Sequence, residues 1–168
     1  MDNTVVSELN KQIQEEFFSA YLYLSMAAYC TSKNLLGFTN WFTVQAKEEM
    51  DHAMGFYNHL IAQGEKVELL ALAKPEASFG SPLEVAKAAL THEQHITARI
   101  KKIYEHAKEE KEYATELFVT WYIKEQVEEE ANAVQLIEKI KMIGDSKGSL
   151  YMLDKELGKR TYAPAQIV

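Results

Sequence analysis

The chain has 168 residues, of which 47% are hydrophobic and 11% aromatic, so it is long enough to bury the core of one globular domain. Only three prolines and seven glycines interrupt it, which permits long helices and argues against a sheet of many short strands. The formal net charge of −7 argues against a nucleic-acid partner, which usually requires a basic face, and it suits a protein that attracts cations.

Apolar residues recurring with a helical period predict two long helices in the first third of the chain. The first covers about residues 4–32 and the second about residues 36–63, where Gly64 offers a natural C-terminal end. Each would be roughly 40 Å long at 1.5 Å per residue. The stripe of the first is Leu9, Ile13, Glu16, Ala20, Tyr23 and Ala27, and that of the second is Phe38, Phe42, Gln45, Glu49, His52 and Phe56.

A third helix is predicted after a connection of about residues 65–80. Ser81 is placed to cap it, with Pro82 at the first helical position and Glu84 three residues after the cap. Its buried face would be formed by Ala86, Ala89, Glu93, Ile96, Ile100 and Ile103.

The last two predicted helices differ in length. The fourth begins near Glu112 and ends near Gly144, whereas the fifth is short, about residues 147–157. The fifth carries a leucine stripe, Leu150, Leu153 and Leu157, for which a completed four-helix bundle has no room. We therefore expect it to be a contact surface between copies of the chain.

Loop lengths predict the topology. The short links make antiparallel hairpins of the first two helices and of the next two, while the long connection can travel the length of the bundle. The predicted fold is thus all-α: a four-helix bundle with one long crossover over residues 1–145, followed by a short helix and tail over residues 146–168.

Cysteine content and the apolar pattern bear on where such a protein acts. Cys30 is the only cysteine, so an intrachain disulfide or a thiolate metal cluster cannot form. The first residues lack the basic and apolar regions of a signal peptide, and no stretch approaches the ~20 apolar residues of a membrane span. We expect a cytoplasmic protein with no membrane partner.

Acidic residues interrupt the apolar stripes of all four long helices near their middles. They are Glu16, Glu49 and Glu93 on the first three helices, and Glu125 and Glu129, with Gln126 between them, on the fourth. A buried carboxylate costs several kcal/mol unless it is paired or bound to metal. Four that meet would repel one another unless a cation neutralised them.

The pair Glu49 and His52 forms a Glu-x-x-His motif, which places both side chains on one helical face. About one such pair is expected by chance in this composition, so its weight comes from the acids on the other helices. Carboxylates with one imidazole suit Fe²⁺, Mn²⁺ or Zn²⁺ better than Ca²⁺. Two divalent cations would balance four ionised glutamates.

Four segments carry a resemblance to the bacterial non-haem ferritins over essentially the whole chain. They are Gln-Glu-Glu-Phe-Phe-Ser-Ala-Tyr-Leu-Tyr around Glu16, Lys-Glu-Glu-Met-Asp-His-Ala around Glu49, His-Glu-Gln-His around Glu93, and Trp-Tyr-Ile-Lys-Glu-Gln-Val-Glu-Glu-Glu around Gln126. The resemblance implies iron storage in a hollow homo-oligomeric shell of 24 subunits around a ferric oxide core. It also implies a ferroxidase, with Fe²⁺ and O₂ or H₂O₂ as substrates.

The resemblance further implies which residues bind iron. One iron would be held by Glu16, Glu49 and His52, and a second by Glu49, Glu93 and Glu129, so that Glu49 bridges the two. Gln126 would lie close by, and Tyr23 matches a tyrosine beside the dinuclear site. A third iron position, found in bacterial members, maps onto Glu48, Glu125, Glu128 and Glu129.

Two departures from related families refine this expectation. Bacterioferritins and di-iron oxidases carry a second Glu-x-x-His on the last bundle helix, whereas this chain has Gln126-x-x-Glu129. The second iron thus lacks an imidazole, which indicates a site that passes iron on. Met50 stands where bacterioferritins place a haem ligand, but non-haem members carry Met there too, so we expect no haem.

Two other functions fit parts of the pattern. A di-iron oxidase or peroxidase of the rubrerythrin type would retain its metals, but that class calls for the second Glu-x-x-His. A purely structural shell subunit should have lost the ligands that are present here. The remaining histidines, His59, His92, His95 and His106, are interpreted as surface or rim residues.

Overall fold

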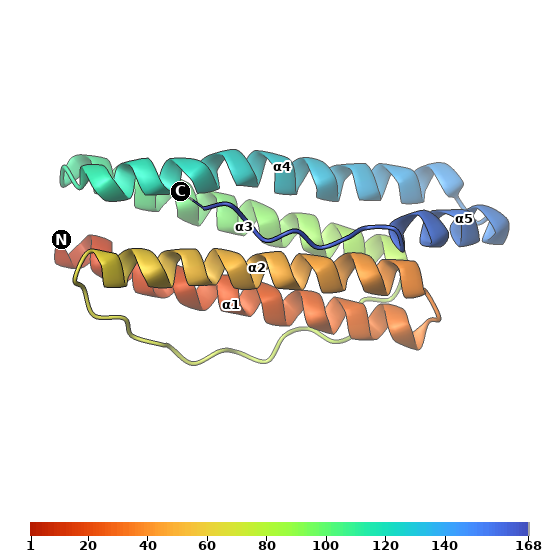
Figure 1. Ribbon diagram of the computed structural model, residues 1–168. Helices are drawn as coiled ribbons and strands as arrows, with labels where there is room; N and C mark the ends of the chain where they lie inside the picture. The colour runs from red at the N-terminus through yellow and green to blue at the C-terminus, as the bar shows by residue number, and fades with distance from the viewer. Residues whose placement is uncertain (168) are drawn as a thin grey trace.

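The computed structural model describes residues 1–167, which form five helices and no strand (Figure 1). The helices are α1 (Asn3–Ser32), α2 (Leu36–Ala62), α3 (Pro82–Glu109), α4 (Tyr113–Ile143) and α5 (Lys147–Leu157). The predicted all-α bundle with one long crossover and a short fifth helix is confirmed. Val168, the last residue of the predicted C-terminal segment, lies outside the described residues. Within residues 1–167, none of the helices combines the length and apolar character needed to cross a bilayer.

The starts of α1 and α3 follow ordinary capping chemistry. The Asp2 side chain accepts a hydrogen bond from the Thr4 amide at 2.7 Å. The Ser81 hydroxyl accepts one from the Glu84 amide at 3.2 Å, with Pro82 at the first helical position as the sequence predicts. These side chains satisfy amide groups that have no carbonyl partner in the first turn of a helix.

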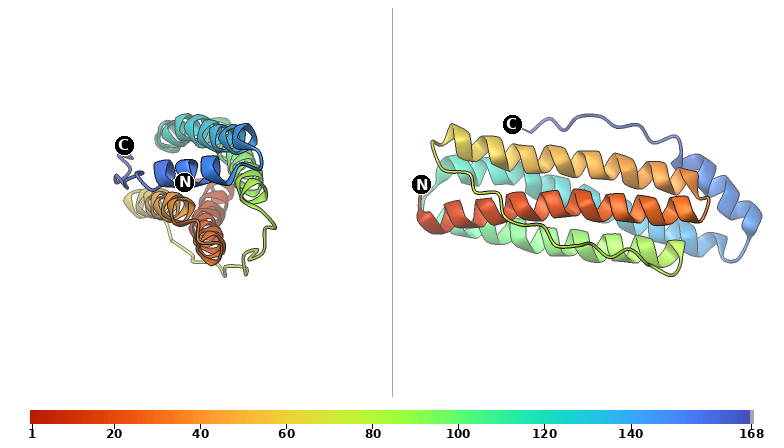
Figure 2. Two further views of the ribbon diagram at one scale, coloured as in Figure 1. Left: turned by 90° about the vertical axis from the view of Figure 1, so that its right-hand side faces the viewer. Right: turned by 90° about the horizontal axis from the view of Figure 1, so that it is seen from below.

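The crossover, residues 63–81, runs along α1 from one end of the bundle to the other (Figures 1 and 2). Side chains of α1 donate to its carbonyl groups at three points: Asn10 to Lys66, Gln14 to Ala71 and Ser25 to Glu76. These bonds pair carbonyls of a segment that has no secondary structure of its own.

Helix α5 packs against the start of α2. The Asp154 carboxylate accepts the amides of Gly37 at 2.8 Å and Phe38 at 3.0 Å, and thereby caps α2 from a distant part of the chain. The residue at the N-cap position, Leu35, has no side-chain oxygen with which to do so. A Cβ atom on Gly37 would lie 1.6 Å from the Asp154 carbonyl oxygen, so only glycine permits this approach.

The apolar core consists of two clusters at opposite ends of the bundle. One includes Met26, Phe38 and Phe42 and continues to Leu153 and Leu157 of α5, with Leu150 packed against it. The prediction that this leucine stripe is a contact surface between copies is therefore wrong, because the stripe packs on the core of its own chain. The other includes Leu9 and Phe56. A layer of buried polar side chains lies between the two clusters, and a core rarely contains such a layer without a function.

Candidate metal centre

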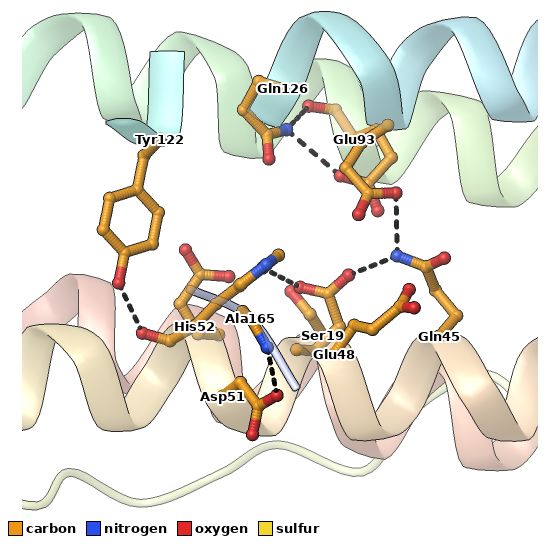
Figure 3. Close-up of polar contacts among 12 residues, drawn as sticks. Ser19, Gln45, Glu48, Asp51, His52, Glu93, Tyr122, Gln126 and Ala165 are labelled. Carbon is orange, nitrogen blue, oxygen red and sulfur yellow. Dashed lines mark hydrogen bonds and ion pairs between the residues drawn. The ribbon is translucent and has the colours of Figure 1, made fainter. Parts of the chain in front are cut away.

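The polar layer receives a buried acid from each of the four long helices. Glu16 of α1, Glu49 of α2, Glu93 of α3 and Glu129 of α4 are at most 5% exposed. In Figure 3, Glu93 and Gln126 point from α3 and α4 toward the side chains of α2. Helices that are far apart in sequence therefore bring their acids to one place.

Three of the ligand atoms form a group at the α1–α2 face of this layer. Single atoms of Glu16, Glu49 and His52 lie within 4.8 Å of one another. The His52 Nδ1 atom is 3.2 Å from Glu49 Oε2, whereas His52 Nε2 and Glu16 Oε2 are buried without a hydrogen-bond partner among residues 1–167. An unsatisfied buried polar group costs about 1–3 kcal/mol, and a bound cation would remove that cost for the oxygen.

A second group adjoins the first and shares Glu49. Atoms of Glu49, Glu93 and Glu129 also lie within 4.8 Å of one another. The Gln126 amide donates to Glu93 Oε2 at 3.1 Å, and the Tyr23 hydroxyl donates to the other oxygen of Glu93. The arrangement provides two adjoining sets of oxygen ligands with one carboxylate between them, and only the first set includes an imidazole. The assignment of these atoms as metal ligands stays a prediction.

The His52 ring is held in place by aromatic side chains of α4. It packs edge-on against Trp121 and Tyr122, with ring centroids 5.6 and 5.9 Å away. The Tyr122 hydroxyl donates to the His52 carbonyl at 2.9 Å. A Cβ on Gly55 would lie 2.2 Å from this hydroxyl oxygen, which explains the glycine one turn after His52 on α2.

Comparison with known proteins decides the family. The family model described as "Ferritin-like domain" matches residues 6–143, most of the chain. This chain belongs to the ferritin family.

Several ferritins are similar to it over nearly their full length. The bacterial non-heme ferritin of Staphylococcus aureus (strain MRSA252) is 40% identical over 162 residues, which are 96% of this chain and 98% of the relative. That of Staphylococcus haemolyticus (strain JCSC1435) is 37% identical with the same coverage. A solved open pore ferritin from the archaeon Archaeoglobus fulgidus has a TM-score of 0.95 at 44% identity, covering 96% of this chain and 98% of that one. The resemblance to bacterial non-haem ferritins is therefore confirmed.

Burial and charge set the protonation of the candidate metal centre. Burial, followed by the charge of Glu49, raises the pKa of Glu16 and that of Glu93 to about 8, and it raises the pKa of Glu129 as well. Burial also opposes charge on Glu49 and His52, but each favours the other's charged form. The pKa of Glu49 is lowered and that of His52 is raised to about 10. In the metal-free protein burial therefore favours the protonated forms of Glu16, Glu93 and Glu129, while Glu49 and His52 favour each other's charged forms, so a cation that bound here would have to displace protons.

These shifts predict how the metal-free protein responds to pH. The folded-state pKa of Glu16, about 8, lies above the ordinary value of 4.5, so the folded state keeps a proton that the unfolded chain loses across this window. The contribution of Glu16 to stability therefore falls as pH rises from 4.5 toward 8. In the Glu16→Gln variant this position has no group that titrates. Its free energy of unfolding relative to that of wild type should therefore increase between pH 6 and pH 8 by on the order of 1–2 kcal/mol. Guanidinium unfolding in the presence of a chelator measures this.

The exposed Glu105 on α3 supplies a control for that measurement. Glu105→Gln should follow the pH dependence of the wild type. If Glu16→Gln also followed it, Glu16 would already be ionised in the folded metal-free protein.

The residues predicted for a third iron position do not all gather in this structure. Single possible ligand atoms of His52, Glu125 and Glu129 lie within 4.8 Å of one another. Glu48 instead forms an ion pair with Arg160 at 2.5 Å, and Glu128 is exposed. Over the described part of the chain, no group unites the four acids. The third position stays a prediction that requires Glu48 and Glu128 to move.

The interpretation of His92 as a surface or rim residue is wrong. The residue is 9% exposed, and its Nε2 atom lies 2.7 Å from the Ser19 hydroxyl. It also contacts the Tyr23 ring edge-on, with centroids 6.3 Å apart. His92 directly precedes Glu93 and is turned toward α1. Because it lies one residue away from the apolar stripe, the helical period did not indicate that it is buried.

The sequence places Gln45 on the buried stripe of the second helix but assigns it no role, and it does not single out Gln12. Gln12 and Gln45 are fully buried, and each donates to the glutamate four residues later. The available signal was the spacing Gln-x-x-x-Glu, which occurs once on α1 and once on α2 at the ligand positions. Arg160 lies beyond the last helix, where no periodicity could assign it to the site.

Proposed function

We propose that this ferritin oxidises Fe²⁺ with O₂ or peroxide at the buried centre and stores the product as ferric oxyhydroxide inside a hollow shell of 24 copies of the chain in the cytoplasm. The observation that carries the proposal is the pair of ligand groups joined through Glu49. Iron is the substrate and cargo of this site. The kinship with bacterial non-haem ferritins supports the same reading.

The donor set favours iron and its oxidation. Carboxylate oxygens stabilise Fe³⁺ more strongly than Fe²⁺ because they are hard anionic ligands, and one imidazole does not reverse this preference. Four ionised glutamates balance two Fe²⁺ ions, whereas two Fe³⁺ ions carry two further positive charges. Hydroxide from water must make up that difference, so oxidation at this site releases protons and favours hydrolysed ferric product.

The electrons and protons of the reaction balance as follows. Each Fe²⁺ gives up one electron, so two ions reduce O₂ to H₂O₂, and the ferric ions take up hydroxide and oxide from water while the protons enter solution. Glu49 holds both ions near each other, which lets them deliver the electrons as a pair. Gln126 carries no charge, and the second ion lacks an imidazole, so the product is held weakly enough to move on to the mineral.

Tyr23 is the catalytic residue of this proposal. Its buried hydroxyl donates to Glu93, and burial together with the charge of Glu93 raises the pKa of the phenol. The phenol therefore keeps its proton at neutral pH. If the ring gives an electron to the oxidant in place of one Fe²⁺, the ionised form of Glu93 is positioned to receive its proton, and that Fe²⁺ then reduces the ring again, so two electrons still reach O₂.

One experiment separates this function from a rubrerythrin-type oxidase that retains its metals. The purified protein is sized by light scattering, and Fe²⁺ is then added in air while near-ultraviolet absorbance is followed. A shell that oxidises many more than two Fe²⁺ per subunit supports storage. A monomer or dimer that retains two tightly bound irons would support the oxidase instead.

The third iron position makes a separate prediction. Changing Glu48, Glu125 and Glu128 together to Gln leaves every residue of the two buried ligand groups in place, and a glutamine at position 48 keeps an oxygen that can accept from Arg160, so both groups should still bind metal. The amount of Fe²⁺ oxidised per O₂ consumed should change, because an oxygen-only site beside the pair could supply a further electron. An oxygen electrode at matched iron loading measures the ratio. A ratio and turnover equal to wild type would show that these acids have no catalytic role.

A further inference from the structure

Two of the proposed ligands are supported in the same way by a glutamine one helical turn earlier. On α1, the Gln12 amide nitrogen donates to Glu16 Oε1 at 2.8 Å. On α2, the Gln45 amide nitrogen donates to Glu49 Oε1 at 2.8 Å and to Glu129 Oε2 at 2.8 Å. Both glutamines are fully buried, so water cannot replace these donors.

An arginine binds the other end of each amide. Arg99 of α3 donates from Nε to Gln12 Oε1 at 2.9 Å. Arg160, in the tail after α5, donates from Nη2 to Gln45 Oε1 at 2.9 Å. Arginine offers donors only, so it fixes the amide oxygen toward itself and the amide nitrogen toward the carboxylate.

The arginines are themselves held and neutralised outside the ligand groups. Arg160 lies over the Trp41 ring at 4.5 Å, donates to the Trp41 carbonyl at 3.3 Å and pairs with Glu48. Arg99 lies 3.6 Å from Glu8 and 3.8 Å from Glu15. Each positive charge is matched by an acid, so the arginines orient the amides with little net repulsion of an incoming cation.

We propose that Arg160 and Arg99 are positioning residues of the metal centre, acting through Gln45 and Gln12 on the carboxylates of Glu49, Glu129 and Glu16. This inference rests on the proposed function, because it assigns the supported carboxylates as metal ligands. A buried amide without its arginine can turn over and present its oxygen to a carboxylate. That orientation opposes the ionised form of the ligand, which is the form that binds metal.

On α1, the hydrogen bond from Gln12 leaves the second oxygen of Glu16 open to metal. Each amide occupies one oxygen of its glutamate, and Glu16 Oε2 keeps no other partner over the described residues. The carboxylate is thus held in one rotamer with its second oxygen available. Because Arg160 belongs to the tail that runs back along α2 (Figure 2), the C-terminal segment becomes part of the site.

Arg160→Met tests the proposal, since methionine keeps an unbranched chain over Trp41 and removes every donor. Anaerobic Co²⁺ is the probe, measured by calorimetry and by its visible ligand-field absorption, so that no oxidation is involved. We expect the affinity for Co²⁺ to fall about tenfold, the loss that one to two hydrogen bonds predict, with a changed absorption spectrum. Arg160→Lys, which keeps the charge and some donors, should recover part of the loss.

A double-mutant cycle then distinguishes action through Gln45 from a general effect on the tail. Gln45→Met should weaken Co²⁺ binding, and adding Arg160→Met to it should cause little further loss. Lys159→Met, at the neighbouring exposed position, should match wild type. Arg99→Met tests the contact from Arg99 through Gln12 to Glu16 independently of the tail, and it should weaken Co²⁺ binding at the site containing Glu16. This test remains valid even if the tail variants fail to assemble.

Each outcome bears on one of the two proposals. Equal Co²⁺ affinity and spectrum in Arg160→Met and wild type would overturn the inference. So would an equal loss of Co²⁺ affinity when Arg160→Met is added to wild type and when it is added to Gln45→Met. A wild-type protein that binds no Co²⁺ at the centre would instead overturn the proposed function.

Discussion

Replacing Glu49 and His52 together with alanine should lower the initial rate of aerobic Fe²⁺ oxidation by about 100-fold or more. Glu49 belongs to both ligand groups, and His52 supplies their only imidazole, so the double variant leaves neither group complete. The proposed shell should remain assembled, because both side chains are buried inside one bundle. Stopped-flow absorbance in the near ultraviolet measures the rate.

Met50→Ala serves as the control for that variant, since Met50 lies between the two residues but is 46% exposed. It should oxidise iron at the wild-type rate. If the double variant kept that rate as well, the buried centre would not be the site of oxidation.

Placing aspartate at both Tyr151 and Met152 should break the proposed shell into small oligomers. These side chains are 67% and 62% exposed on α5, while Leu153 and Leu157 of the same helix are buried against the bundle. An apolar surface of this kind is a contact by default, and a charge buried in every copy of a repeated interface costs several kcal/mol each time. Light scattering after size exclusion measures the assembly, and far-ultraviolet circular dichroism should show the helices retained.

Lys155→Glu is the matched control, because it changes the charge of α5 in the same direction at an exposed polar position. It should leave the shell size unchanged. Full-size shells from the aspartate variant would show that this face of α5 is dispensable for assembly.

Deleting residues 146–168 should also impair the shell while leaving a helical bundle, but the structure makes this a less specific test. The deletion removes Asp154, which caps the start of α2, and Arg160, which contacts Gln45. Loss of the shell and loss of metal binding would then occur together.

Much of the fold could be predicted because local signals and global packing agree. Ser81, Pro82 and Glu84 predict the start of α3, and glycines at positions 64 and 144 have positive φ just beyond α2 and α4. The acids of the candidate centre stood out because charge in an apolar stripe conflicts with burial unless something neutralises it.

The parts that sequence could not give depend on contacts between distant segments. The cap that Asp154 provides for α2 joins residues more than a hundred positions apart. The pairing of Glu48 with Arg160 likewise depends on the path of a tail without secondary structure. The burial of His92 depends on how α3 is rotated against α1, which a one-residue offset decides.

Anomalous X-ray diffraction from crystals soaked anaerobically with Zn²⁺ tests whether the buried acids bind metal. We expect two neighbouring anomalous peaks inside each bundle, the first bounded by Glu16, Glu49 and His52 and the second by Glu49, Glu93 and Glu129. Peaks confined to the protein surface, with the buried carboxylates unchanged, would contradict it.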